Sequence, residues 1–245
     1  MKTSRLISLA LGLFLMPGAA AYAEPGFKHA DPFEFDPANS RLVQSTWLPG
    51  IGCPTGARTS DGTYTDPACP TGDRRDRQNE GLLLVKTGPT ANNASAGVVL
   101  RNVPSTVTEL GYDIRKPGAS ADLRGSHCGA GAPRFNVTTE DGTTFFIGCN
   151  SPPADEQHPG NGWLRLRWGG AVPLLAYNAA GVLTPLAGLK VKKLSIVFDE
   201  GQDAGPDNFG AAVLDNIDVN GNLVGQGPTE PGIESGGDGE HGNDD

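Results

Sequence analysis

The sequence predicts an all-β protein, an antiparallel β-sandwich or jelly roll with a disulfide-pinned N-terminal loop. Apolar and polar residues alternate over many short stretches, as they do in strands that bury one face. The chain holds 35 glycines and 20 prolines, and aromatic residues make up 7% of it, a composition typical of short strands joined by tight turns. No stretch repeats its apolar residues roughly every 3.6 positions, so no helix is expected.

The alternation defines the individual strands. Tyr112 and Trp168 fall on the apolar faces of their strands and are expected in the core. Asp141-Gly142 and Asn220-Gly221 are dipeptides that favour tight hairpin turns. The predicted strands, in chain order, are 45–48, 82–86, 97–101, 106–115, 134–138, 143–149, 163–168, 174–177, 190–199, 211–219 and 222–224.

The first 23 residues have the pattern of a signal peptide. Lys2 and Arg5 precede an apolar run from Leu6 to Met16, and Ala21-Tyr22-Ala23 suits a signal peptidase, so cleavage is expected before Glu24. The run is shorter than the about 20 apolar residues of a membrane-spanning helix. A buried N-terminal helix is the weaker alternative. The mature chain is therefore expected to be secreted or periplasmic, without membrane insertion.

Composition divides the mature chain into a body and a tail. Residues 24–225 are expected to form one sandwich domain, loop-rich over 24–80, and residues 226–245 an acidic, glycine-rich disordered tail. The tail carries six carboxylates and no lysine or arginine, and the formal net charge of the chain is −9. This acidic balance argues against nucleic acid or an anionic membrane as a partner.

Four cysteines predict disulfide bonds in an oxidising compartment. Of the three possible connectivities we favour Cys53–Cys69, which closes a loop with little apolar content, and Cys128–Cys149, which joins two strands of a hairpin. A zinc site that includes His127 is the alternative, although the spacings match no zinc template.

The closing segment resembles a known group of folds. Residues 194–201 (LSIVFDEG) and 212–221 (AVLDNIDVNG) look like the last two strands of galactose-binding-like jelly rolls, a group that includes many secreted carbohydrate-binding modules. The resemblance covers about a fifth of the chain. It implies a jelly-roll sandwich and a carbohydrate-binding role.

One strand face has the composition of a sugar-binding platform. Trp163, Arg165 and Arg167 lie on the same side of their strand, so the indole could stack on a pyranose while the guanidinium groups reach hydroxyls or a carboxylate. In the alternative interpretation Trp163 simply covers a loop at the end of its strand.

A second candidate site is the acidic loop that begins at Asp199. Asp199, Glu200, Asp203 and Asp207 lie within nine positions among glycine and proline, a composition that can wrap a calcium ion. An ordinary solvated loop is the alternative. Asp215 is expected to point inward, where it either bonds loop amides or binds a cation.

No catalytic template is present, and no catalytic residue is predicted. The sequence contains no Gly-x-Ser-x-Gly or His-Glu-x-x-His motif. Glu109 and Asp113 share a strand face, but four residues of strand separate them by about 13 Å, too far for a glycosidase pair. The sequence therefore favours a secreted, non-catalytic carbohydrate-binding module, stabilised by calcium if the acidic loop binds it. The alternatives are a structural or protein-interaction domain, and a glycoside hydrolase with carboxylates from neighbouring strands.

Overall fold

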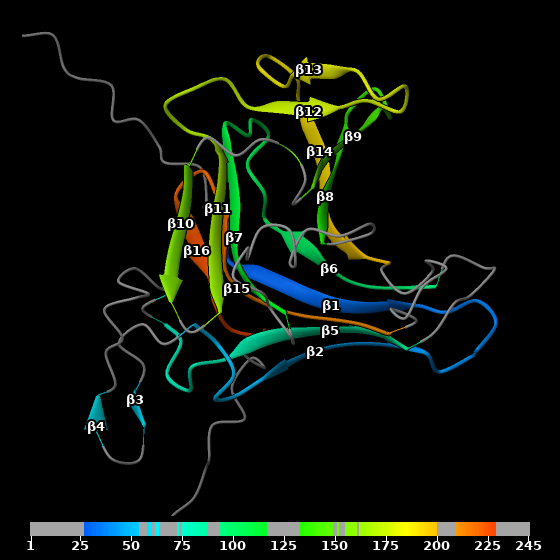
Figure 1. Cartoon of the computed structure of the whole chain (residues 1–245). Helices are drawn as coiled ribbons and strands as arrows, with labels where there is room; N and C mark the ends of the chain where they lie inside the picture. Colours follow the sequence, from blue (N-terminus) through cyan, green and yellow to red (C-terminus); the bar gives the residue numbers. More distant parts are fainter. Residues whose placement is uncertain are drawn as a thin grey trace, which may run out of the picture.

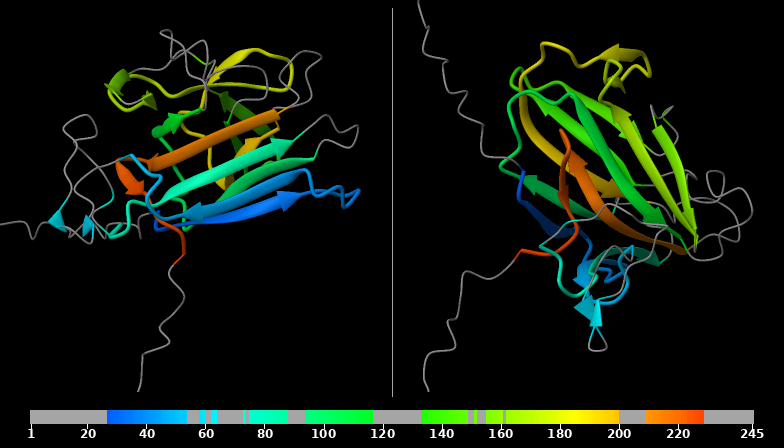
Figure 2. Two further views of the ribbon diagram at one scale, coloured as in Figure 1. Left: turned by 60° about the horizontal axis from the view of Figure 1, so that its bottom comes forward. Right: turned by 90° about the vertical axis from the view of Figure 1, so that its left-hand side faces the viewer.

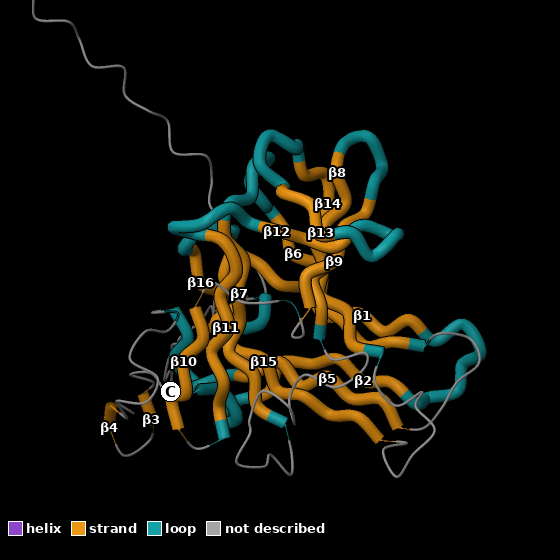
Figure 3. Tube along the Cα trace, turned by 45° about the horizontal axis from the view of Figure 1, so that its top comes forward, coloured by secondary structure: helices purple, strands orange, loops and turns teal. Residues whose placement is uncertain are grey.

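The computed structural model describes residues 27–53, 58–59, 62–63, 73, 75–87, 94–116, 133–148, 151, 155–160, 162–199 and 209–228. The regular structure of this part of the chain consists of strands, and it contains no helix (Figure 3). It accordingly offers no helix with the length and apolar character needed to cross a membrane. The all-β prediction is confirmed.

The strands form two large antiparallel sheets and a small hairpin (Figure 1). Sheet A has the order β1 (His29–Phe35), β6 (Ser95–Arg101), β14 (Val191–Phe198), β8 (Arg134–Thr139), β9 (Thr144–Gly148), β12 (Leu175–Tyr177) and β13 (Leu183–Pro185). Sheet B has the order β10 (Asp155–Gly160), β11 (Trp163–Gly169), β7 (Glu109–Arg115), β15 (Phe209–Val219), β5 (Gly81–Thr87) and β2 (Val43–Leu48), and β16 (Asn222–Val224) pairs with β15. The hairpin joins β3 (Arg58–Thr59) to β4 (Gly62–Thr63).

The chain crosses repeatedly between the two sheets. Strand β5 lies in sheet B, β6 in sheet A, β7 in sheet B and β8 in sheet A, the kind of crossover found in double-sheet jelly rolls. Strands β1 and β2, one from each sheet, lie side by side (Figures 1 and 2). Trp47 Nε1 donates to the carbonyl of Ala30 at 3.0 Å there, and Ser45 Oγ donates to the carbonyl of Gly97 at 2.6 Å. These bonds join the two sheets along one edge.

The inner faces of both sheets supply one continuous core. At its centre Tyr112, Phe135 and Trp168 pack together with ring centroids 5.3–6.1 Å apart, Phe135 from sheet A and the other two from sheet B. The aromatic rings meet stacked or edge to face, the arrangements their quadrupoles favour. The predicted core positions of Tyr112 and Trp168 are confirmed.

Besides the short hairpin of β3 and β4, which falls in the predicted loop, three strands of the two large sheets escaped prediction, and all three lie at sheet edges. Strands β1 and β13 bound sheet A, and β10 bounds sheet B. Each contains a proline, Pro32, Pro185 and Pro159 respectively, and each is polar or short. Proline cannot donate to a strand ladder and is tolerated at edges, so the same residue that argues against a strand in sequence marks an edge strand here.

The predicted turn at Asn220-Gly221 is confirmed by left-handed φ values of 53° and 78°. The described chain continues past β16 to residue 228. Gly225 N donates to Asp73 Oδ2 at 3.2 Å, and Gly227 N donates to Glu80 Oε2 at 2.8 Å, so the chain stays bonded to the body as far as Gly227. The predicted signal peptide and residues 229–245 lie outside the described residues.

We expect Tyr112→Phe to lower the free energy of unfolding by about 1–2 kcal/mol, because the buried Tyr112 hydroxyl donates to the carbonyl of Pro133 at 2.7 Å and its loss leaves that acceptor unpaired. Urea unfolding measures the change. Tyr177→Phe on the partly exposed outer face of sheet A is the matched control, with little expected change. Equal midpoints for the two variants would contradict the prediction.

Candidate functional site

The structure places Trp163, Arg165 and Arg167 together on the outer face of sheet B, but that face is covered. The three residues are 1%, 4% and 9% exposed. Trp163 packs against Cys53, which belongs to the segment that follows β2. The expectation of a solvent-exposed indole is therefore wrong, because alternation shows which residues share a face and not what lies over it. A ligand-binding role for these residues stays a prediction.

The two arginines converge on a buried carboxylate. Asp113 accepts hydrogen bonds from Arg165 Nε at 2.8 Å and Nη2 at 2.7 Å, a bidentate pair, and from Arg167 Nη2 at 3.3 Å. Asn216 Nδ2 adds a bond at 2.9 Å, and Arg167 Nε lies 3.1 Å from Asp218 Oδ2. Asp113 is fully buried, so its charge depends on these partners.

A glycine makes room for this cluster. Gly111 is opposite Arg167 in the β7–β11 register. A Cβ atom at position 111 would lie 2.2 Å from Arg167 Cδ and 2.7 Å from the carbonyl oxygen of Leu166. The arginine side chain thus lies across the bare backbone of β7.

Asp215 is buried, but on the outer face of sheet B and not toward the core as predicted, because the register shift after it turns Ile217 and Val219 to the opposite face; there it bonds loop amides. Its Oδ2 accepts from Cys53 N at 2.7 Å, and its Oδ1 accepts from Asn216 N at 2.5 Å. A Cβ atom at Gly225 would lie 2.6 Å from Oδ1, so the chain after β16 passes directly over this carboxylate. Asp215 thereby ties the N-terminal segment to sheet B.

Burial governs the protonation of the acids in this cluster. Desolvation, followed by repulsion from Asp113, raises the pKa of Asp215 well above its usual value. Burial likewise raises the pKa of Asp218 to about 6, with Arg167 acting in the opposite direction.

Asp113 and Asp215 are cross-strand partners, which is the arrangement that the hydrolase alternative requires. Both are almost completely buried, at 0% and 1% exposed, and their oxygens are taken up by the contacts above. A glycosidase pair must reach substrate and water. The contacts of this pair are structural.

The predicted calcium loop is described only at its first residue. Asp199 receives a bidentate ion pair from Arg134, with both N–O distances at 2.8 Å, so its carboxylate already has a cationic partner. Glu200, Asp203 and Asp207 lie outside the described residues, and calcium binding stays a prediction.

Cys53 is disulfide-bonded. Cys69, Cys128, Cys149 and His127 lie outside the described residues, so the predicted pairings and the zinc alternative stay untested.

The outer face of sheet A carries a different set of side chains. Ser195, Asn136, Phe146 and Tyr177 follow one another in register across β14, β8, β9 and β12, and we call them the aromatic row. Phe146 and Tyr177 are partly exposed, and as direct cross-strand neighbours their Cβ atoms lie about 5 Å apart. The alternation of Phe145, Phe146 and Ile147 already put Phe146 outside, but only the pairing of β9 with β12 brings Tyr177 beside it.

Polar groups flank the aromatic row. The Oδ1 atom of Asn136 is buried and has no hydrogen-bond partner within the described part of the chain. The Arg134–Asp199 ion pair lies two residues along β8 from Asn136, with its side chains 29% and 26% exposed. Phe33 covers Gly97, where a Cβ atom would lie 2.4 Å from the ring. The face thus combines partly exposed rings with hydrogen-bonding and charged groups.

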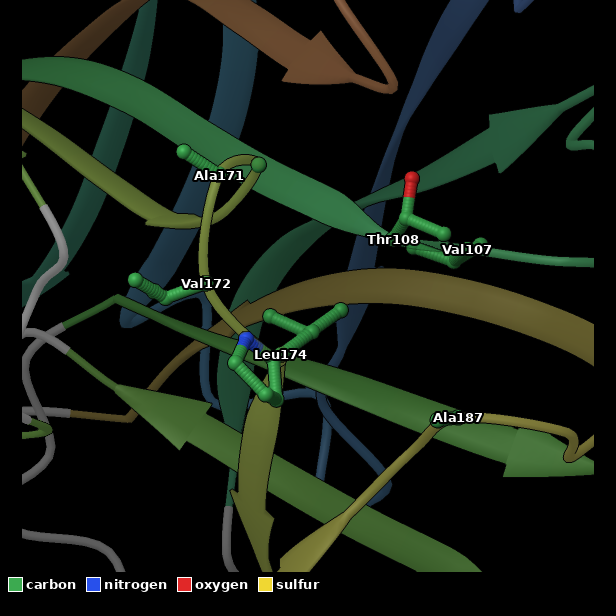
Figure 4. A pocket seen from close by; sticks show the side chains of 8 residues that line it. Val107, Thr108, Ala171, Val172, Leu174 and Ala187 are labelled. Atoms are coloured by element: carbon green, nitrogen blue, oxygen red, sulfur yellow. The ribbon is translucent and has the colours of Figure 1, made fainter.

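An apolar pocket of about 280 Å³ lies at the end of the molecule near β12 and β13. Figure 4 shows Val107, Ala171, Val172, Leu174 and Ala187 around it. The side-chain hydroxyl of Thr108, also in the lining, lies 3.2 Å from Asn220 Oδ1. Val172, Leu175, Val182 and Leu183 are exposed, at 51%, 38%, 57% and 39%. The pocket suits an apolar group rather than a polar ligand.

Fold and surface together define a β-sandwich with one covered outer face and one that presents aromatic and polar side chains. No protein-family model matches the chain, and no curated protein sequence is significantly similar to it. Among solved structures it is similar to the family 11 carbohydrate-binding module of the cellulosomal cellulase Lic26A-Cel5E of Clostridium thermocellum, with 12% identity, a TM-score of 0.37, and coverage of 84% of this chain and 92% of that one. A family 11 module from Clostridium thermocellum in complex with a β-1,3-1,4-mixed-linked tetrasaccharide gives 12% identity, a TM-score of 0.36, and coverage of 82% and 91%.

Both structures are carbohydrate-binding modules, the group that the closing strands resemble in sequence. TM-scores below 0.5 are too low for either match to carry an argument about the ligand of this chain. That argument has to come from its own side chains.

We expect Arg165→Met to lower the free energy of unfolding by about 3–5 kcal/mol, because it leaves the buried Asp113 charge without its bidentate partner. Arg101→Met is the matched control. Arg101 pairs with Asp31 in solvent, with its side chain 58% exposed, and its loss is expected to cost less than about 1 kcal/mol. Urea unfolding of both variants measures the difference, and similar losses would contradict a structural role for the cluster.

We expect Asp218→Asn to change the pH dependence of stability. Between pH 4 and about 6 the unfolded chain ionises Asp218 while the folded chain keeps it protonated, so wild-type stability falls as pH rises and the asparagine variant lacks this loss. The stability of the variant relative to wild type should rise by up to about 3 kcal/mol over this range.

Urea unfolding at pH 4, 5, 6 and 7 measures this change. Asp141→Asn is the control. Hydrogen bonds from Thr139 and Thr143 lower the pKa of Asp141, so its contribution to stability is lost only as pH falls below about 4, and its difference from wild type should stay nearly constant from pH 5 to 7. A stability difference between Asp218→Asn and wild type that is independent of pH would refute the proposed burial effect.

Proposed function

We propose that this protein is a non-catalytic carbohydrate-binding module whose ligand lies on the outer face of sheet A. The observation that carries the proposal is the aromatic row, in which a serine, an amide and two partly exposed rings follow one another across four neighbouring strands. A flat sheet face of this kind matches an extended sugar chain.

The chemistry of the row suits a pyranose. Aromatic rings present large, rigid apolar surfaces on which the C–H face of a sugar can stack, while side chains beside them bond its hydroxyls. Phe146 and Tyr177 supply the rings, and Tyr177 also offers a phenolic hydroxyl.

The Oδ1 atom of Asn136 is an acceptor on this face to which no described group donates a hydrogen bond. A buried acceptor without a partner costs about 1–3 kcal/mol. A ligand hydroxyl that donates to Asn136 Oδ1 would recover this cost, and Ser195 lies beside it in the same register.

The sugar site proposed here lies on the outer face of sheet A, whereas the sequence predicted it on the face of β11 that carries Trp163. Trp163, Arg165 and Arg167 are occupied with Cys53 and Asp113 and are buried, whereas the side chains of Phe146 and Tyr177 reach solvent. The export predicted from the N-terminal pattern would bring such a module to extracellular or periplasmic glycans.

A protein-interaction role is the second candidate. The apolar pocket beside Val107 and Leu174, together with the exposed Val172, Leu175 and Val182, is a surface that could bury a partner's apolar side chain. This patch borders the aromatic row through Leu183, which is opposite Tyr177.

We expect Tyr177→Ala to weaken retention of the preferred glycan by about tenfold, equivalent to ~1.4 kcal/mol, because it removes a stacking ring. The preferred glycan is first selected on a glycan array with the mature protein, and affinity electrophoresis then compares the variants. Leu183→Ala, an exposed apolar neighbour without a ring, is the matched control and should bind as wild type. Unchanged retention by Tyr177→Ala, with the fold intact, would place the site elsewhere.

A further inference from the structure

Three lysines gather at the start of β14, next to the proposed glycan face. Lys190, Lys192 and Lys193 are all exposed. The pairing of β14 with β8 shifts register between Val191 and Lys193, so Lys192 is the extra residue of a bulge. We call these residues the lysine cluster.

The lysine cluster is not neutralised by ion pairs with described residues. Lys190 Nζ lies 3.3 Å from the hydroxyl of Thr106, and none of the three ammonium groups pairs with a described carboxylate. Two acids, Glu140 and Asp141, lie in the turn after β8. Glu140 N donates a backbone hydrogen bond to the carbonyl of Lys190. The Asp141 carboxylate accepts from Thr139 Oγ1 and Thr143 N within that turn.

Lys193, the last residue of the lysine cluster, lies on the same face of sheet A as the aromatic row. Lys193 is opposite Thr138, and Thr138 is opposite Thr144, whose hydroxyl lies 3.1 Å from that of Thr138. Each of these residues lies two positions along its strand from Ser195, Asn136 or Phe146, a separation of roughly 7 Å. A cationic and hydroxyl-bearing row therefore runs parallel to the aromatic row, within one side-chain length of it.

We propose that this face binds an anionic glycan, whose pyranose rings stack on Phe146 and Tyr177 while its carboxylate or sulfate groups lie against Lys192 and Lys193. The inference rests on the proposed function and names its ligand class. Uronate carboxylates and sulfate esters offer the same chemistry to an ammonium group.

The net charge of the whole chain affects where an anionic glycan can approach the protein. With a formal net charge of −9 the protein repels polyanions over most of its surface, so a local cluster of cations decides where such a chain can approach. A neutral glycan could accept hydrogen bonds from these lysines but would gain no charge attraction. Because the pairs form in solvent, each is individually weak and screened by salt, and binding should weaken as ionic strength rises.

The test uses two pairs of polymers that differ only in charge. Polygalacturonate is compared with its fully methyl-esterified form, and dextran sulfate with dextran, by affinity electrophoresis of the mature protein at low and raised salt. Stronger retention by polygalacturonate identifies uronates as the ligand, and stronger retention by dextran sulfate identifies sulfated chains.

The double variant Lys192→Glu/Lys193→Glu should lose about tenfold in affinity for the charged polymer. The matched control, Lys28→Glu/Arg77→Glu, reverses two exposed cations elsewhere and changes net charge equally. It should bind as wild type.

Four results would overturn the inference. Equal binding of the charged and uncharged polymers, unaffected by the lysine variant but lost in Tyr177→Ala, would leave a neutral-glycan module and remove the anionic ligand. Equal losses of affinity in the lysine variant and its control would show that binding depends on the net charge of the protein and not on the lysine cluster. Absence of wild-type binding to all four polymers, or full binding by Tyr177→Ala, would remove the aromatic row from the site and the inference with it.

Discussion

Asp113 keeps its charge inside the protein because two arginines of the neighbouring strand face it. Arg165 holds both of its oxygens, and Arg167 links it to Asp218 on the other side of β7. Three central strands of sheet B are thus joined by charge as well as by their backbone ladders. A buried ion pair contributes little net stability, but loss of one partner is costly, so the cluster makes this arrangement of strands the one that satisfies its charges.

The same region of sheet B binds the segments that cover its outer face. Asp215 and Asn216, at the bulge in β15, accept hydrogen bonds from Cys53 N and Asp73 N, and Gly225 N reaches Asp73. Segments far apart in sequence therefore lie together over sheet B, where glycines at 52, 111 and 225 allow the close approach. Sheet A keeps partly exposed rings on its outer face, which makes it the surface available to a ligand.

Cationic side chains therefore have different surroundings on the two sheets. On sheet B the side chains of Arg165 and Arg167 are buried, form ion pairs with internal carboxylates and fix the arrangement of the strands. On sheet A the lysines at the start of β14 remain in water beside the aromatic row, where a cation costs nothing to keep and can meet a ligand. Burial, more than residue identity, separates the structural charges from those that we propose to bind a ligand.

The sequence by itself determined the all-β class, the core positions of Tyr112 and Trp168 and the turn at Asn220-Gly221, because each follows from a local period or a dihedral preference. It placed Asp215 toward the core, because simple alternation does not account for the bulge that follows this residue in β15. It could not reveal the edge strands β1, β10 and β13, whose prolines and polar residues argue against strands when read alone. It also named the wrong open face, since alternation places Trp163 and Arg165 on one side of a strand without showing what lies above them. Tertiary structure alone brought Cys53 over Trp163, Tyr177 beside Phe146, and Lys193 onto the same face of sheet A as both rings, because strand order and register depend on contacts between residues distant in sequence.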